Sequence, residues 1–180
     1  MIEMELRALL TNKLQVKRKL EQHGCKWEAI GIQIDTIYER CDMQQIVNMP
    51  IFRIRRSDEK KLLTLKVFME DLDTAEEFEI EISDDIIMDK MLQRIGFLPK
   101  IQVVKRRQFV EYGKFIICMD EIDELGDFIE IENISEKNDE KDKIYGEMKT
   151  ILLELGVKED EIKKEKYYEM MIRKQGEKNE

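Results

Sequence analysis

Alternation of apolar and charged residues with a period of two runs through most of this 180-residue chain. In the opening stretch MIEMELRALL, Glu3, Glu5 and Arg7 occupy every second position, and apolar residues fill the positions between them. Successive side chains of a β-strand point to opposite faces, so the pattern predicts a strand with one charged face. A half-buried antiparallel strand also turns polar residues to solvent, and this stretch by itself leaves the role of the charges open.

The same alternation predicts seven further strands. They lie in residues 31–40, 50–58, 60–68, 76–84 and 125–134, with two more in residues 101–122 that join near Tyr112 and Gly113. Glycine at that join suits a tight hairpin turn. Helical spacing appears in residues 12–22, 84–99, 144–157 and 166–173. Eight strands with about four helices predict an α+β fold dominated by an antiparallel sheet.

The length of the chain fits a single domain, which we place at residues 1–174. A charged linker at residues 135–143 precedes the helix at 144–157, and we assign Leu152 and Leu155 of that helix to the core rather than to a dimer contact. The oligomeric state stays open between a monomer and a homodimer. The polar end QGEKNE, residues 175–180, is expected to be disordered.

Composition narrows the classes of function. The chain has 40 acidic and 31 basic residues and a net charge of −9, which argues against general nucleic-acid binding because that requires a basic surface. Cys25, Cys41 and Cys118 lack the spacing of a zinc site and the density of a disulfide framework. The longest apolar runs are far shorter than the roughly 20 residues that span a bilayer. We therefore expect a cytoplasmic protein with reduced thiols and no membrane contact.

His23 is the only histidine in the sequence, and it lies where a helix is expected to end at Gly24. A Ser-His-Asp relay or a histidine metal site would depend on this one ring. Carboxylates, lysines and arginines must therefore carry out any chemistry.

The charged strand faces use acids and cations almost to the exclusion of neutral polar residues. Arginine offers a planar fork to phosphate oxygens, lysine offers a compact charge, and clustered carboxylates suit Mg²⁺ or Mn²⁺. On spacing alone, a solvated sheet face is an equal alternative. Closing the strands into a barrel would gather the charges in a lined interior, where their interactions are stronger. The residues concerned are Glu3, Glu5, Arg7, Arg53, Arg55, Lys66, Glu77, Glu79, Glu81, Lys105, Arg107, Asp120, Glu130 and Glu132.

In this order the charged residues resemble the CYTH superfamily, the triphosphate tunnel metalloenzymes, which includes class IV adenylyl cyclases and thiamine triphosphatases. The family's ExExK motif on the first strand reads EMELR at residues 3–7. The resemblance continues through FRIR, LTLK, EFEIE, VVKRR, CMD and LGDFIEIE, and EKYYEMM resembles the family's SYxELL, with Tyr167 at the tyrosine. Residues 112–132 are most similar to the class IV cyclase branch.

The resemblance implies a closed eight-stranded antiparallel β-barrel with flanking helices, open at both ends, whose bore holds a triphosphate. It also implies roles for the site residues. Phosphate oxygens would be bound by Arg53, Arg55, Lys66, Lys105 and Arg107. Mg²⁺ or Mn²⁺ would be held by Glu3, Glu5, Asp120, Glu130 and Glu132. Catalytic cations would be Arg7, Lys66 and Lys105, and supporting residues would be Glu77, Glu79, Glu81 and Tyr167.

Arg7 departs from the family motif, which has lysine at this position. An arginine pKa of about 12.5 or more makes it a poor base, so the change slightly favours binding or cyclisation over hydrolysis. The leading hypothesis is metal-dependent conversion of ATP to cyclic AMP and pyrophosphate. One alternative is a triphosphatase for tripolyphosphate, thiamine triphosphate or nucleoside triphosphates, and the other is a non-catalytic sensor of nucleotides or polyphosphate.

Residues that contact a nucleobase are harder to assign. Tyr38, Phe68 and Tyr167 are aromatic residues placed to stack on a base, but aromatic residues beside strands belong more often to the core, which we favour for them.

Overall fold

The computed structural model describes residues 2–40, 50–58, 60–69, 74–135 and 141–177. Cys41, one of the three thiols discussed above, lies outside these residues.

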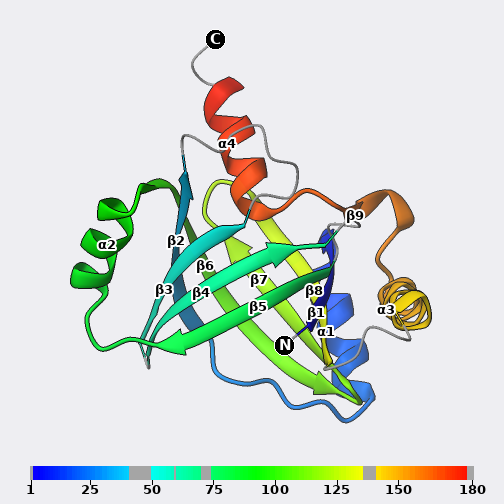
Figure 1. The fold of residues 1–180 in the computed structure, drawn as a ribbon. Helices are drawn as coiled ribbons and strands as arrows, with labels where there is room; N and C mark the ends of the chain where they lie inside the picture. The colour runs from blue at the N-terminus through cyan, green and yellow to red at the C-terminus, as the bar shows by residue number, and fades with distance from the viewer. Residues whose placement is uncertain (1, 41–49, 59, 70–73, 136–140, 178–180) are drawn as a thin grey trace.

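An antiparallel sheet closes on itself to form a barrel (Figure 1). Neighbouring strands pair in the order β5-β4-β3-β2-β6-β7-β8-β1, and pairing of β1 with β5 closes the ring. The predicted α+β fold with a closed eight-stranded antiparallel barrel is therefore confirmed. The eight strands are β1 (Ile2–Leu9), β2 (Gly31–Arg40), β3 (Ile51–Ser57), β4 (Lys61–Phe68), β5 (Thr74–Glu81), β6 (Phe97–Tyr112), β7 (Phe115–Ile122) and β8 (Gly126–Ser135).

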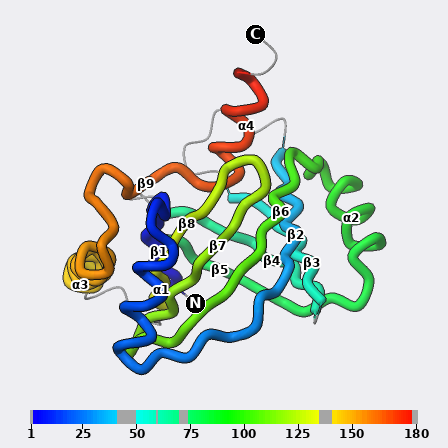
Figure 2. The backbone as a smooth tube through the Cα atoms, turned by 180° about the vertical axis from the view of Figure 1, so that it is seen from behind, coloured from blue at the N-terminus to red at the C-terminus, as the bar shows by residue number. Residues whose placement is uncertain are grey.

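Two helices cover the outer face of β1 and β8, as Figure 2 shows. They are α1 (Lys13–Gln22) and α3 (Lys141–Leu155). The alternation along β1 turns Leu6 outward, where it shares a buried cluster with Leu20 of α1 and Met148 of α3. Leu152 and Leu155 are also buried there, which confirms their assignment to the core. α1 ends at Gln22, with His23 as its C-cap, and Gly24 follows with φ of +81°, so the helix stops before this glycine as predicted.

A third helix, α2 (Asp85–Arg94), packs on the outer face of β2 and β3. Its Leu92 shares a cluster with Ile54 and with Tyr38, whose hydroxyl donates to Asp89 Oδ1 at 2.8 Å. Tyr38 is 1% exposed and is therefore a core residue that does not face the bore.

The helix α4 (Tyr167–Glu177) begins at one end of the barrel and rises away from it (Figure 1). Its Tyr167, Met170 and Met171 are buried against inward-facing apolar residues such as Val103 and Phe128. Burial of this apolar stripe holds α4 against this end of the barrel. α4 also continues to Glu177, three residues into the segment predicted to be disordered, and residues 178–180 lie outside the described part.

Three local features differ from the predicted elements. β6 begins at Phe97 and includes Pro99. The pairing register of β6 with β2 shifts between Ile37 and Tyr38, and Pro99 lies at this shift. The proline, which has no N–H to donate, therefore falls where the hydrogen-bond ladder is already irregular. A two-residue strand, β9 (Ile162–Lys163), pairs with Arg7 and Ala8. A short 3₁₀ turn at Glu159–Glu161 precedes it.

No helix in the described part of the chain is long and apolar enough to cross a membrane.

Candidate active site

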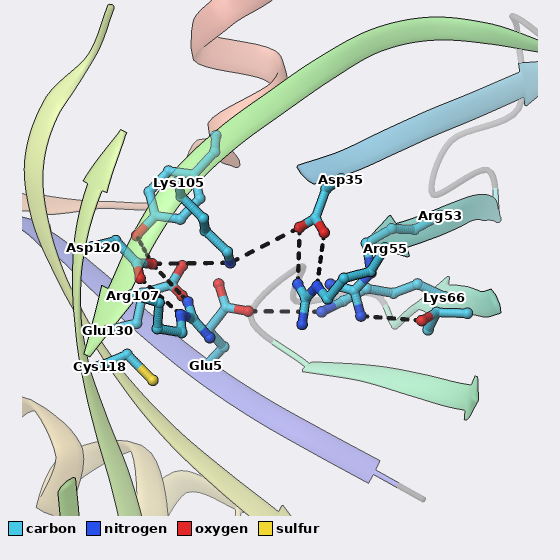
Figure 3. Close-up of polar contacts among 12 residues, drawn as sticks. Glu5, Asp35, Arg53, Arg55, Lys66, Lys105, Arg107, Cys118, Asp120 and Glu130 are labelled. Atoms are coloured by element: carbon cyan, nitrogen blue, oxygen red, sulfur yellow. Dashed lines mark hydrogen bonds and ion pairs between the residues drawn. The ribbon is translucent and has the colours of Figure 1, made fainter. Parts of the chain in front are cut away.

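Five basic side chains reach the interior of the barrel from three strands (Figure 3). Arg53 and Arg55 come from β3, Lys66 from β4, and Lys105 and Arg107 from β6. Residues two apart on a strand share a face, so each pair points into the bore. Their side chains are only 4 to 16% exposed. The structure therefore brings together all five residues predicted to bind phosphate.

The five carboxylates predicted to hold a metal also lie in the bore. Glu3 and Glu5 come from β1, and Asp120 comes from β7. Glu130 and Glu132 come from β8, which pairs with β1 so that Glu5 lies directly opposite Glu132. Like charges opposite each other on adjacent strands repel, so this arrangement requires cations beside it.

Arg107 supplies one such cation. Its Nε and Nη2 donate to the two oxygens of Asp120 at 2.7 and 2.6 Å, and its Nη1 donates to Glu132 Oε1 at 2.9 Å. Nη2 also donates to Glu130. Burial alone would raise the pKa of Glu130, but Arg107 and Arg7 hold it well below its usual value. The Arg107 guanidinium thus lies among three of the carboxylates predicted to be metal ligands.

Lys66 and Arg53 form a second group of ion pairs on the other side of the bore. Lys66 Nζ lies 2.7 Å from both Glu3 Oε2 and Glu77 Oε1. Arg53 Nη2 lies 3.5 Å from Glu79 Oε2 and 3.8 Å from Glu77 Oε2. Burial opposes ionisation of Glu3, but Lys66 lowers the pKa of that carboxyl well below its usual range. Glu77 and Glu79 therefore contact the basic residues that they were predicted to orient.

Glu81 differs from Glu77 and Glu79, the other two acids of β5 that were assigned a supporting role. It is exposed, and the residues that the structure describes place no cation within ion-pair distance of it. Glu81 lies two residues beyond Glu79 on β5, where the strand leaves the lined part of the bore.

Asp35 of β2 belongs to this network although the sequence analysis did not assign it to the site. Its two oxygens accept hydrogen bonds from Arg55 Nε and Nη2 at 2.7 and 2.8 Å, and Lys105 Nζ lies 3.9 Å away. Burial would raise the pKa of Asp35, but Arg55 holds it well below its usual range. The sequence signal that could have identified Asp35 is its position as an isolated acid on the polar face of a predicted strand.

Arg7 links the first strand to α4. Its Nε donates to Glu130 Oε1 at 2.9 Å, its Nη1 donates to the backbone oxygen of Glu165 at 3.2 Å, and its guanidinium lies 4.9 Å from the centre of the Tyr167 ring. The Tyr167 hydroxyl in turn donates to Asp120 Oδ2 at 3.2 Å. Burial opposes the charge of Arg7, but Glu130 raises its pKa. Arg7 therefore stays protonated and acts as a fixed positive charge.

Lys105 and Cys118 are two further titratable groups in the bore. Lys105 Nζ lies 4.0 Å from Asp120 Oδ2, and burial together with nearby Arg107 lowers the pKa of this lysine. The Cys118 sulfur donates to Glu132 Oε1 at 3.7 Å, and burial raises the pKa of the thiol. Cys118 is free, as predicted, and it is a neutral thiol.

The bore contains a cavity of about 250 Å³, lined by the five cations, by Arg7 and by the carboxylates of Glu3, Glu5, Asp35, Glu77, Glu79, Glu130 and Glu132. The cations and carboxylates line its middle, and apolar residues line the part below α4.

The carboxylates suit a hard divalent ion in their chemistry, because they offer only oxygen donors from adjacent strands. In the described ranges, however, no three histidine, cysteine or acidic side chains converge as ready metal ligands. Arg107 instead neutralises Asp120, Glu130 and Glu132. Metal binding by these acids therefore requires Arg107 to exchange them for another anion.

Comparison with known proteins gives the relatives of the chain. A family model described as the CYTH domain matches residues 1–168. A Methanocaldococcus jannaschii protein, provisionally named an adenylate cyclase, is 28% identical over 172 residues, which are 94% of this chain and 98% of that protein.

Solved structures agree with this match. The PH1819 protein of Pyrococcus horikoshii is 28% identical, with a TM-score of 0.81 over 96% of this chain and 99% of that chain. A Hippeastrum protein, provisionally called an adenylyl cyclase and described as having a dominant triphosphatase activity, has a TM-score of 0.64. It is 17% identical, covering 97% of this chain and 95% of that chain, so this likeness concerns the fold alone.

Proposed function

The chain belongs to the CYTH domain family, which binds triphosphate substrates, and from this premise we propose that it is a divalent-metal-dependent enzyme acting on the triphosphate of a nucleotide. The observation that carries the proposal is the arrangement of charge inside the barrel. Five cations from β3, β4 and β6 line one cavity together with carboxylates from β1, β2, β5 and β8. A triphosphate with its bound metal needs both signs of charge within one enclosed space.

The proposed division of labour follows from the donor types. Arg53, Arg55, Lys66, Lys105 and Arg107 bind phosphate oxygens. Glu3, Glu5, Asp120, Glu130 and Glu132 hold Mg²⁺ or Mn²⁺, which when bound neutralises charge on the phosphates. A substrate phosphate replaces the carboxylates that now contact Arg107, and those carboxylates become available to the metal.

Cyclisation of ATP is the reaction that we favour. In this reaction the 3′-oxygen forms a bond to the α-phosphorus, the bond from that phosphorus to the bridging oxygen breaks, pyrophosphate leaves, and the hydroxyl proton passes to solvent. The name of the Methanocaldococcus relative supports this reaction, and so does Arg7, whose raised pKa makes it unsuited to deprotonating water. The cations and the metal contribute by positioning the substrate and neutralising charge.

Hydrolysis of the terminal phosphate is the second candidate. The observation in its favour is the Hippeastrum protein, which has the same fold and is described as chiefly a triphosphatase. Cyclisation and hydrolysis need the same phosphate and metal ligands and differ in which phosphorus is attacked.

Product analysis separates the candidates. The purified protein is incubated with ATP or with tripolyphosphate, each with Mg²⁺ or Mn²⁺, and every product is identified by chromatography. Cyclic AMP with pyrophosphate supports the cyclase. Orthophosphate with ADP, or with pyrophosphate from tripolyphosphate, supports the triphosphatase. Binding without any product contradicts both enzymes and leaves a sensor of nucleotides or polyphosphate.

A further inference from the structure

The cavity has two unlike ends. Below α4 its wall is apolar, formed by Ile37, Ile51, Phe68 and Val103, which belong to the same cluster as Tyr167, and by Tyr168, which packs against that cluster. At the opposite end the wall includes Glu79, Glu132 and Ile134. The two ends are well separated, since Phe128 of the apolar cluster and Ile134 lie six residues apart on β8, a span of roughly 20 Å in a strand.

The cations of the bore follow an order along this axis. Lys66 lies two residues from Phe68 on β4, and Arg53 lies two residues from Ile51 on β3. Lys105 lies two residues from Val103 on β6, and its Nζ is 5.8 Å from the centre of the Tyr167 ring. Of the five cations assigned to phosphate, these three are therefore the closest to the apolar end. Arg55 and Arg107 lie two residues further along their strands, and Arg107 donates to Glu132 of the other end.

The apolar end also has the few polar groups that an organic ligand needs. Lys166 and Tyr168 line the cavity there, and Lys166 Nζ lies 5.0 Å from the centre of the Phe68 ring. Sites for small organic molecules combine apolar and aromatic walls with a small number of polar groups that fix orientation. A phosphate placed against the same apolar wall would lose much of its hydration, and fewer cations line this end than the middle of the bore.

We infer that the end of the cavity below α4 receives the nucleobase and ribose, and that the triphosphate extends away from α4, past Lys66, Arg53 and Lys105 toward Arg55 and Arg107. This inference rests on the proposed function and adds the direction of the bound nucleotide. It places the α-phosphate near Lys66 and Arg53 and the terminal phosphate near Arg107. Phe68 and Tyr168 then determine the preference for a nucleotide over inorganic triphosphate.

The test compares two ligands that share the triphosphate and differ in the nucleoside. Calorimetric titrations with ATP and with tripolyphosphate use Ca²⁺ as the divalent ion, and chromatography checks that neither ligand is consumed. The variants are Tyr168→Ala, which truncates a half-buried side chain, and Phe68→Leu, which keeps most of the buried volume. Ile134→Ala is the matched variant at the opposite end. Circular dichroism establishes that each variant is folded.

Loss of an aromatic contact to a base costs about 1 to 3 kcal/mol, so each α4-end variant is expected to raise the Kd for ATP at least about fivefold. In the same variants the Kd for tripolyphosphate is expected to stay within about twofold of the value for the unmodified protein. Ile134→Ala is expected to change neither the Kd for ATP nor the Kd for tripolyphosphate. Equal effects on both ligands, or no effect of the α4-end variants, would overturn the inference. So would selective weakening of ATP binding by Ile134→Ala. If the unmodified protein binds neither ligand, the proposed function itself fails.

Discussion

Asp35 and Arg55 form a two-point ion pair inside the barrel, with Arg55 Nε and Nη2 donating to the two carboxylate oxygens at 2.7 and 2.8 Å. Register places the two residues directly opposite each other on β2 and β3. The pair fixes the orientation of the guanidinium before any ligand arrives, and a fixed donor loses less conformational freedom when it binds phosphate.

Replacing Asp35 by asparagine is expected to destabilise the fold, because Arg55 and Lys105 would lose their shared counter-ion within the barrel. Breaking a buried pair from one side typically costs about 3 to 5 kcal/mol, and the retained amide oxygen lowers the expected loss to roughly 2 to 4 kcal/mol. Urea unfolding measures this loss in the free energy of unfolding. Asp123→Asn, which affects an exposed pair with Arg106, should change stability by less than about 0.5 kcal/mol. Equal stability of the two variants would contradict the structural role of Asp35.

Arg7→Lys restores the residue of the family motif and tests why this chain has arginine. Arg7 contacts Glu130 and the backbone oxygen of Glu165 simultaneously. A lysine ammonium cannot match the planar fork of arginine, so we expect a loss of about 1 to 2 kcal/mol and faster hydrogen exchange in α4. Arg18→Lys on the exposed face of α1 is the matched control. Unchanged protection of α4 in Arg7→Lys would show that this link does not hold the helix.

Glu5→Gln and Glu130→Gln test the carboxylates of β1 and β8 as metal ligands. Removing one charged oxygen donor should weaken Mn²⁺ binding in the presence of tripolyphosphate by at least about tenfold, as measured by electron paramagnetic resonance of free Mn²⁺. Glu81→Gln is the matched control, since Glu81 is exposed at the end of β5. Similar Mn²⁺ affinities in all three variants would argue against the proposed ligands.

Asp85 gives a prediction for the pH dependence of stability. Hydrogen bonds from Lys61 and Arg56 lower its pKa to about 2. The folded state therefore favours the anion, and this contribution is complete above the unfolded pKa near 4 and is lost as the pH falls through about 2. Its size is about 1 to 2 kcal/mol after allowance for solvent screening, since Lys61 is 43% exposed.

Denaturant unfolding between pH 5 and pH 2 checks this prediction. The acid-induced loss of stability should be smaller in Asp85→Asn than in the unmodified protein by that amount. Parallel stability curves for the two proteins would contradict it.

The sequence predicted the strands well because the bore and the outer core impose opposite polarity on alternate residues. Glu3, Glu5 and Arg7 are inward for the same reason that Leu6 is outward. The pattern works less well where a strand is irregular. β6 enters at Phe97 and passes Pro99 in a shifted register with β2, whereas the proline suggested a boundary.

The partners of the charged residues were harder to predict. Alternation places Asp120, Glu130 and Arg107 in one bore, but it does not show that the arginine contacts both acids when no ligand is present. Position along the strand likewise suggested a role for Glu81 equal to that of Glu77, whereas their exposure differs. The packing of α4 against the barrel depends on contacts between segments far apart in the chain, which local periodicity does not encode.

Titration of the protein with tripolyphosphate and Mg²⁺ at low temperature tests most directly whether the cations of the bore bind a triphosphate. Calorimetry of the unmodified protein should show saturable binding at one site. Lys66→Gln should raise the Kd at least about tenfold, because a charge-assisted hydrogen bond to phosphate is worth about 1.5 to 3 kcal/mol. Arg106→Gln, which removes an exposed cation on the outer face of the same barrel, should leave the Kd unchanged. Equal affinities in all three proteins would contradict binding by the cations of the bore.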